Sequence, residues 1–238
     1  MPRLYQGSVR TPKLSVMITG QDVARFVPRV LASARRVADE IVFVDGGSRD
    51  HTVEIAAREK IARIFTRPFN GNFAEQKNFG LARCRGDWIL LLDSDELLGD
   101  ELCEQIPKLT RSWSMRWYKI PRYWVVRDVR PLRHIASRLH YPDYQLRLFR
   151  NSPFFRYPTN SPIHEHFPKR GRGFGRRLKR GHIFHFAIAL ASRAEREERT
   201  RRYEMIDPRS RETNAIYLYE QYQHEVRECA DSLTEEFG

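Results

Sequence analysis

Short apolar runs alternate with amphipathic stretches over the first hundred residues of the chain. Each apolar run predicts a strand, and the stretches between them, where apolar residues recur at helical spacing, predict helices. The expected strands are residues 14–19, 40–44, 61–66 and 88–92, and the expected helices start near residues 26, 51, 72 and 99. This order predicts an α/β fold with a mostly parallel sheet flanked by helices.

The pattern changes beyond about residue 110. There, residues 117–126 and 144–149 predict strands, residues 169–180 predict a mobile basic loop, and residues 192–206 and 213–229 predict polar helices. A chain of 238 residues suits one sizeable domain, and we find no internal repeat. We therefore expect a single domain over residues 1–238.

The composition fits a soluble globular protein, with 41% hydrophobic and 30% charged residues. The longest apolar runs, residues 88–92 and 186–191, are far shorter than the roughly 20 residues that cross a bilayer. The N-terminal residues lack the apolar segment of a secretory signal, so we expect a cytoplasmic protein. The three cysteines, Cys84, Cys103 and Cys229, are too scattered for a disulfide framework or a cysteine-based zinc site.

Positive charge is concentrated in the middle of the chain. The formal net charge is +12, and residues 111–181 contain 18 lysines and arginines but only three acidic residues, Asp128, Asp143 and Glu165. Because this basic segment is also rich in aromatic residues, we expect it to face an anionic partner. The candidates are nucleic acid, a phosphorylated glycan and an anionic membrane surface. No nucleic-acid-binding motif is recognisable, so nucleic acid is the least expected of the three.

The acidic sequence Asp93-Ser94-Asp95-Glu96 directly follows the apolar run at residues 88–92. Its carboxylates should emerge at the carboxyl edge of the sheet, where α/β folds bind ligands. Two acidic residues separated by one residue can hold a hard divalent ion, and that ion can bridge to a diphosphate. The alternative is an acidic turn that caps the helix expected near residue 99.

A second motif, Asp45-Gly46-Gly47-Ser48, ends another expected strand of the same sheet. The glycines allow the backbone to approach a ligand closely, and Asp45 could accept hydrogen bonds from a ribose or a base. The dinucleotide-binding pattern Gly-x-Gly-x-x-Gly is absent. The alternative is an ordinary turn in which Asp50 caps the next helix.

Four blocks of the sequence together resemble the family 2 glycosyltransferases with the GT-A fold. The blocks are LSVMIT (14–19), VDGGSRDHT (44–52), QKNFGLA (76–82) and GDWILLLDSDE (86–96), in the order and spacing of that family. The resemblance covers roughly residues 14–105. It implies a Rossmann-like GT-A sheet and an enzyme that uses a nucleotide sugar, with UDP as the expected nucleotide.

The resemblance also implies roles for individual residues. The donor nucleotide would contact Thr19, Gln21, Asp22, Asp45, Gly47, Ser48, Lys77, Asn78 and Asp93. Asp95 would bind Mg²⁺ or Mn²⁺ on the diphosphate, and His185 would complete that metal site. Many relatives have Asn-Glu where this chain has Gln21-Asp22, and the change keeps an amide followed by an acid.

The second half resembles a narrower branch, the enzymes similar to the lipopolysaccharide core β-1,4-glucosyltransferases. Residues 144–150 (YQLRLFR) and 163–165 (IHE) match the Arg-Leu-Phe-Arg strand and the following His-Glu pair of that branch. This implies an inverting hexosyl transfer in cell-envelope polysaccharide synthesis, with Glu165 as general base and with Arg147 and His164 contacting the acceptor. The alternative for Glu165 is a salt bridge to a neighbouring arginine.

These resemblances imply three parts within one domain. They are a nucleotide-sugar-binding half at 14–110, an acceptor-binding and catalytic half at 111–191, and C-terminal helices at 192–238. The basic segment would recruit an anionic glycan or lipid-linked acceptor, with peripheral contact at the inner face of the cell membrane. The alternating charges of residues 192–202 predict a solvated helix. Two alternatives stay open: a nucleotidyltransferase, although residues 19–22 lack its glycine-rich loop, and a nucleic-acid-binding protein.

Overall fold

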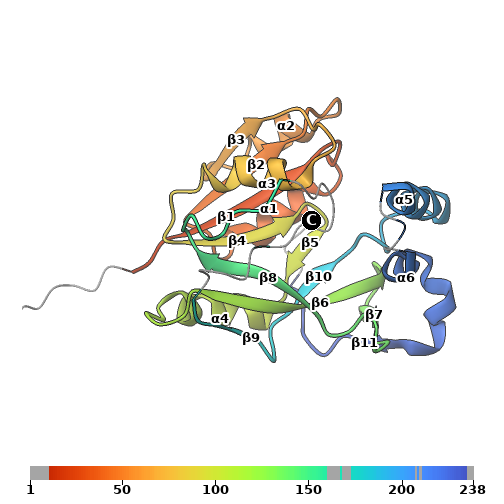
Figure 1. The fold of residues 1–238 in the computed structure, drawn as a ribbon. Coiled ribbons are helices and arrows are strands. Elements are labelled where there is room, and N and C mark those ends of the chain that lie inside the picture. Colours follow the sequence, from red (N-terminus) through yellow and green to blue (C-terminus); the bar gives the residue numbers. More distant parts are fainter. Residues whose placement is uncertain (1–10, 160–166, 168–172, 207, 209–210, 235–238) are drawn as a thin grey trace, which may run out of the picture.

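The computed structural model describes residues 11–159, 167, 173–206, 208 and 211–234. In the N-terminal half, four parallel strands lie side by side in the order β3-β2-β1-β4 (Figure 1). Their bounds are Leu14–Gly20 (β1), Glu40–Asp45 (β2), Ala62–Thr66 (β3) and Trp88–Asp93 (β4). Each matches a predicted apolar run to within one residue at either end. The predicted parallel core is therefore confirmed.

Helices cover both faces of these strands. They are α1 (Val27–Arg35), α2 (Thr52–Ala56) and α3 (Phe73–Leu81), whereas α4 (Asp100–Thr110) lies beside β6 (Trp117–Arg127). Successive side chains of a strand point to opposite faces, so Val16 and Ile18 of β1 pack on the side of α1, whereas Met17 packs on the side of α3. Because both faces are covered, the strands are apolar throughout instead of alternating.

Antiparallel strands extend the sheet in the second half. β8 (Asp143–Arg150) pairs with β4, and β6 (Trp117–Arg127) pairs with β8. β7 (Arg133–Ile135) lies on the other side of β6, and β11 (Val226–Glu228) pairs with β7 at the edge. The fold is the expected α/β arrangement, with parallel pairs from β3 to β4 and antiparallel pairs from β4 through β8, β6 and β7 to β11.

Three short strands complete the sheet. β5 (Glu96–Leu98) pairs with β10 (Ile183–His185), which also lies parallel to β6. β9 (Gly175–Arg177) pairs with β6, and the next residue, Leu178, is buried. The prediction of a loop was therefore wrong for residues 175–177, and residues 169–172 lie outside the described part of the chain.

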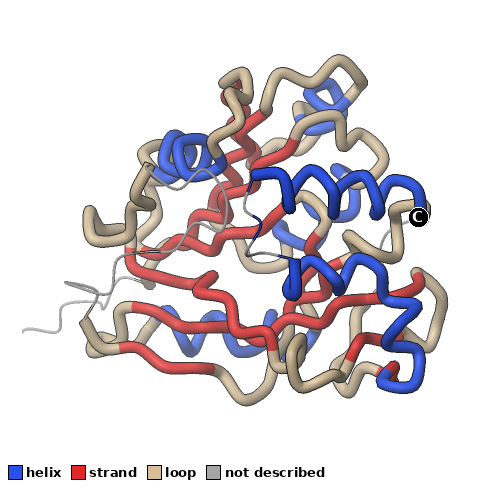
Figure 2. The backbone as a smooth tube through the Cα atoms, turned by 45° about the vertical axis from the view of Figure 1, so that its right-hand side comes forward, coloured by secondary structure: helices blue, strands red, loops and turns tan. Residues whose placement is uncertain are grey.

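The C-terminal segment lies beside one end of the sheet (Figure 2). Helix α5 (Arg193–Ile206) was predicted, but the single helix expected over residues 213–229 was wrong. Short elements replace it: α6 (Arg211–Asn214), the 3₁₀ helix η2 (Ala215–Glu225) and β11. Burial of Ile216 in the cluster that includes Trp124, and pairing of Val226 with Ile135, override the local helical spacing. Within the described ranges, no helix is long and apolar enough to cross a bilayer.

Candidate active site

The carboxyl ends of β1, β2 and β4 meet at one edge of the sheet. In their register, Thr19 of β1 lies opposite Asp93 of β4, and Gly20 lies opposite Asp45 of β2. Parallel strands bring their carboxyl ends together, and open α/β sheets bind ligands there. The structure thus brings candidate residues from three separate sequence blocks to one edge.

A pocket of about 410 Å³ opens at this edge, and we call it the edge pocket. Four residues predicted to contact the donor line it: Thr19, Gln21, Asp22 and Asp93. Its walls also include Gln76 of the QKNFGLA block, together with Phe69, Phe73 and Arg202, which no sequence motif indicated. The rings of Phe69 and Phe73 lie 4.7 Å apart between centroids. The pocket therefore combines an aromatic wall with a few polar groups, as small-molecule sites do.

Asp45, Gly47 and Ser48 form a turn behind the edge pocket. The buried carboxylate of Asp45 accepts hydrogen bonds from the backbone N–H groups of Gly47 at 3.0 Å and Ser48 at 3.1 Å. Gly47 has φ +91°, a conformation that side chains other than glycine rarely adopt. Ser48 Oγ accepts a hydrogen bond from the N–H of Asp22 at 2.9 Å. The turn fixes the loop that carries Asp22, so it shapes the pocket.

Helix α3 contributes Lys77 and Asn78 in different ways. Lys77 Nζ lies 3.4 Å from Asp93 Oδ1 at the sheet edge. The side-chain amide of Asn78 donates to the carbonyl of Tyr157 at 2.8 Å and accepts from its N–H at 2.9 Å. Asn78 therefore holds the chain near Tyr157, and its contact with a nucleotide stays a prediction.

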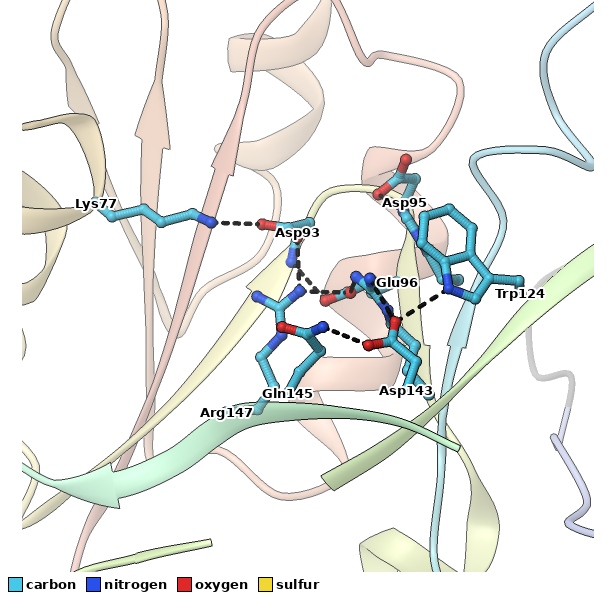
Figure 3. A network of polar contacts seen from close by, with 10 residues as sticks. Lys77, Asp93, Asp95, Glu96, Trp124, Asp143, Gln145 and Arg147 are labelled. Atoms are coloured by element: carbon cyan, nitrogen blue, oxygen red, sulfur yellow. Dashed lines mark hydrogen bonds and ion pairs between the residues drawn. The ribbon is translucent and has the colours of Figure 1, made fainter. Parts of the chain in front are cut away.

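Asp93 belongs to a buried ion network (Figure 3). Arg147 Nη2 lies 2.6 Å from Asp93 Oδ2 and 2.6 Å from Glu96 Oε1. The fully buried Glu96 also pairs with Arg122 at 2.8 Å, and Arg122 continues to Asp143 at 2.7 Å. These contacts link β4, β5, β6 and β8.

The network keeps Asp93 ionised. Burial alone would raise the pKa of the Asp93 carboxyl, but the charges of Arg147 and Lys77 hold it well below its usual value. Burial would likewise lower the pKa of Arg147, whereas the carboxylates of Asp93 and Glu96 raise it. Arg147 is thus a charged partner of the sheet-edge carboxylates, and its contact with an acceptor stays a prediction.

Replacing Arg147 with alanine is expected to lower the free energy of unfolding by about 3–5 kcal/mol, because it leaves the buried Glu96 with one fewer cation. Urea unfolding followed by circular dichroism measures the change. The control is Arg58→Ala, which removes an exposed arginine and should change the free energy by less than about 0.5 kcal/mol. Equal values for the two variants would contradict a structural role for the network.

The pairing of β5 with β10 brings Asp95 and His185 together. His185 lies opposite Glu96 in the register, and its Nε2 atom is 3.3 Å from Asp95 Oδ1. Burial would raise the pKa of Asp95, but the charge and hydrogen bond of His185 lower it. In Figure 3 the Asp95 carboxylate points away from Glu96 and Arg147, so the ion network leaves it available to a ligand.

The donor chemistry of Asp95 and His185 fits a divalent metal ion. Two ligands at about 2.1 Å from one octahedral ion, at right angles to each other, lie about 3 Å apart. No cluster of three or more His, Cys, Asp or Glu side chains that could hold a metal occurs in the described part of the chain. Mg²⁺ commonly binds one or two carboxylates and takes its other ligands from water and substrate phosphates, so the pair suffices.

The start of helix α4 excludes the alternative that the acidic motif at residues 93–96 is a helix cap. The helix begins at Asp100 with Gly99 at its cap, and no side chain forms a capping hydrogen bond. Glu96 instead belongs to β5, where it holds the arginines of the ion network. Asp93 and Asp95 therefore do not serve to cap the helix.

Helix α5 reaches the site, although its charge pattern predicted a solvated helix. One side is solvated, with Arg201 paired to Glu198 at 2.8 Å. On other sides Thr200 is buried and Arg202 lines the edge pocket. The charge of Arg199 adds to that of His185 in lowering the pKa of the half-buried Asp95. A helix with so few apolar residues gives no periodic signal of the side that faces the protein.

His164 and Glu165 lie outside the described residues, so the structure places neither of them. The chain on either side is placed. The carbonyl of Thr159 accepts a hydrogen bond from Asn72 Nδ2 at 2.9 Å, and the ring of Phe167 stacks on Tyr157 with centroids 4.0 Å apart.

Together, the sheet order, the edge pocket and the nearby carboxylates and histidine define an α/β protein of the GT-A type. The family model described as glycosyl transferase family 2 matches residues 15–194. The chain belongs to that family, and the predicted family and fold are confirmed.

The curated relatives agree with this family over part of their length. An uncharacterised glycosyltransferase of Rickettsia bellii is 35% identical over 108 residues, which are 45% of this chain and 36% of that protein. A TPR repeat-containing protein of Synechococcus elongatus is 32% identical over 155 residues, 64% of this chain and 35% of that protein. The chain thus spans a little over a third of the length of these relatives.

Two solved structures share the fold. A mannosyltransferase from Pyrobaculum calidifontis, solved with GDP-Man and Mn²⁺, is 13% identical with a TM-score of 0.55, and the match covers 82% of this chain and 61% of that chain. TarS from S. aureus is 14% identical with a TM-score of 0.51, and the match covers 87% of this chain and 65% of that chain.

Proposed function

We propose that this protein is an inverting glycosyltransferase that moves a hexosyl group from a nucleotide diphosphate sugar to a hydroxyl of a glycan or lipid-linked acceptor. The observation that carries the proposal is the position of the edge pocket, which is lined by Asp93 and Ser94 and so adjoins Asp95. A nucleoside seated there has its diphosphate beside Asp95 and His185. The GDP-Man and Mn²⁺ of the Pyrobaculum mannosyltransferase support this arrangement, and the sequence resemblance favours UDP.

Asp95 and His185 would hold Mg²⁺ or Mn²⁺. When bound, the ion neutralises charge on the departing diphosphate. Asp93 stays ionised through Arg147 and Lys77, so it can accept hydrogen bonds from the ribose. The residues behind the pocket, Asp45 among them, keep its wall in a fixed shape.

Arg202, which lines the edge pocket, is proposed to bind the donor diphosphate. Among the described residues that line the edge pocket, Arg202 is the cation, whereas Asp22 and Asp93 are anions. A diphosphate is anionic, and a guanidinium can donate two parallel hydrogen bonds to phosphate oxygens. The C-terminal helices thus belong to the donor site, in addition to residues 14–110.

Replacing Arg202 with alanine is expected to weaken binding of the nucleoside diphosphate by about tenfold, because one charge-assisted contact is lost. Isothermal titration with UDP and Mn²⁺ measures the dissociation constant. Arg201→Ala is the matched control, because Arg201 lies one position earlier on the helix and pairs with Glu198 instead. Equal weakening in both variants would contradict a specific contact by Arg202.

Glu165 is proposed to activate the acceptor. The acceptor oxygen forms a bond to the anomeric carbon while the bond from that carbon to the diphosphate oxygen breaks, and the hydroxyl proton passes to Glu165. Attack from the face opposite the diphosphate inverts the anomeric centre. Acceptor contact by His164 and Arg147 is part of the proposal, although the ion pairs of Arg147 favour a role in positioning Asp93.

The basic segment, residues 111–181, is proposed to recruit the anionic acceptor. We propose that the reaction takes place on the cytoplasmic side, with peripheral contact at the inner face of the cell membrane, in cell-envelope polysaccharide synthesis. In this proposal the acceptor-binding half, residues 111–191, contains both the basic segment that recruits the acceptor and the general base Glu165.

A further inference from the structure

A second pocket lies where the C-terminal end of β6 meets β7. It has a volume of about 470 Å³, within the range of small-molecule sites. We call it the arginine pocket, and its walls include Val126, Arg127, Val129, Arg130, Arg133 and Gln223. It shares no described lining residue with the edge pocket.

Two of its arginines face each other across neighbouring strands. Arg127 of β6 lies directly opposite Arg133 of β7 in the antiparallel register. Like charges placed directly opposite in a sheet repel and destabilise it. Both residues are exposed, and across the described ranges neither forms an ion pair with an acidic side chain. The pair therefore places two like charges side by side at the pocket wall.

Two acidic residues lie near this pair, and neither of them lies between the two arginines. Asp128, the first residue after β6, pairs with Arg29 at 2.5 Å. Glu228 of β11 lies opposite Arg133 on its other side, so its charge acts on Arg133 and leaves Arg127 as the member of the pair without an acidic cross-strand neighbour on β7. The third arginine, Arg130, donates a hydrogen bond to the carbonyl of Leu233, which fixes its position at the pocket.

A β-bulge brings these cations to the pocket. The register shifts between Val125 and Arg127, so that Val126 is an extra residue on β6. Bulges bend a strand and redirect its side chains, and they are frequent beside functional sites. Here the bulge places both Val126 and Arg127 in the pocket wall.

We infer that the arginine pocket binds a phosphate group. Guanidinium groups match phosphate in charge and in bidentate hydrogen-bond geometry. A phosphate between Arg127 and Arg133 turns their mutual repulsion into attraction for a shared anion, and Gln223 adds a polar side chain to the wall. A phosphorylated sugar and a phospholipid headgroup both carry this chemistry.

The position of the pocket relates it to the proposed reaction. Trp124 of β6 contacts the ring of His185, with centroids 4.4 Å apart. Val126 follows Trp124 by two residues, which corresponds to about 7 Å along a strand. A ligand anchored in the arginine pocket can therefore extend toward Asp95, as a phosphorylated acceptor would. This last assignment rests on the proposed function, whereas phosphate binding does not.

Titration with inorganic phosphate at low ionic strength, with EDTA present, tests the inference. The double variant Arg127→Thr/Arg133→Thr should bind phosphate at least about tenfold more weakly than the wild type, because two charge-assisted contacts are lost. Arg58→Thr/Arg85→Thr removes the same charge from exposed positions outside the basic segment and should bind as the wild type does. Without phosphate, the Arg127/Arg133 variant should melt at the same temperature as the wild type or higher, because the repulsion is gone.

Two further experiments identify which kind of molecule supplies the phosphate group. In the first, the protein is sedimented with phosphatidylcholine vesicles that contain phosphatidic acid. Co-sedimentation of the wild type that disappears in the Arg127/Arg133 variant identifies a lipid headgroup. Displacement of phosphate by a soluble hexose phosphate, without sedimentation, identifies a phosphorylated sugar. Either result supports a phosphate site. Phosphate binding that is equal in the wild type and the Arg127/Arg133 variant, or absent from the wild type, overturns the inference.

Discussion

Replacing Asp95 with alanine is expected to lower kcat/KM for sugar transfer by about a hundredfold or more. A metal ion on the diphosphate contributes several kcal/mol to the transition state, and about 1.4 kcal/mol corresponds to a tenfold change in rate. The variant should keep its fold, because the backbone carbonyl of Asp95 still accepts the hydrogen bond from the N–H of Phe186 at 2.9 Å. Release of nucleoside diphosphate from the donor measures turnover when the acceptor is unknown.

The control for Asp95→Ala is Glu54→Ala, which removes an exposed carboxylate from α2. Its rate should match the wild-type rate at every Mn²⁺ concentration, whereas Asp95→Ala should show no response to Mn²⁺. A variant without Asp95 that keeps the wild-type rate and the wild-type metal response would remove Asp95 from the proposed site.

Replacing Glu165 with glutamine is expected to lower kcat by about 10²–10⁴-fold while the affinity for the donor stays unchanged. Glutamine keeps the size of the side chain but cannot take the acceptor proton. Turnover is measured by nucleoside diphosphate release, and donor affinity is measured by titration with UDP. A specific loss of kcat separates catalysis from a structural salt bridge, which would affect the melting temperature instead.

Glu104→Gln provides the comparison for Glu165→Gln, because Glu104 is an exposed glutamate on α4. Its kcat and melting temperature should equal those of the wild type. If Glu165→Gln turned over at the wild-type rate, another group would have to accept the proton.

The parallel half of the fold could be predicted because its strands are buried on both faces. Burial makes each strand a continuous apolar run that ends where polar residues begin, as Trp88–Asp93 does. The second half was less predictable. The helix expected at 213–229 failed because Val226 pairs with Ile135 at the sheet edge, a contact distant in sequence. Long-range pairing of this kind leaves no local pattern.

The candidate active site was likewise predictable only in part. The pairing of Asp95 with His185 followed from the family resemblance, and the structure places the two side chains 3.3 Å apart. Arg202 could not be predicted, because a charged residue on a polar helix looks solvated until the packing of α5 is known. Glu96 appeared to belong to an acidic motif, but its burial between Arg122 and Arg147 gives it a structural role.

The central claim is that the edge pocket binds a nucleotide sugar with a divalent ion, and thermal-shift measurement across a panel of nucleotide sugars tests it most directly. A ligand that binds the folded protein raises its melting temperature. At least one nucleotide sugar should raise the melting temperature, the rise should be larger with Mn²⁺, and the Mn²⁺-dependent part should vanish in Asp95→Ala. A panel in which no nucleotide sugar changes the melting temperature, with or without Mn²⁺, would contradict the claim.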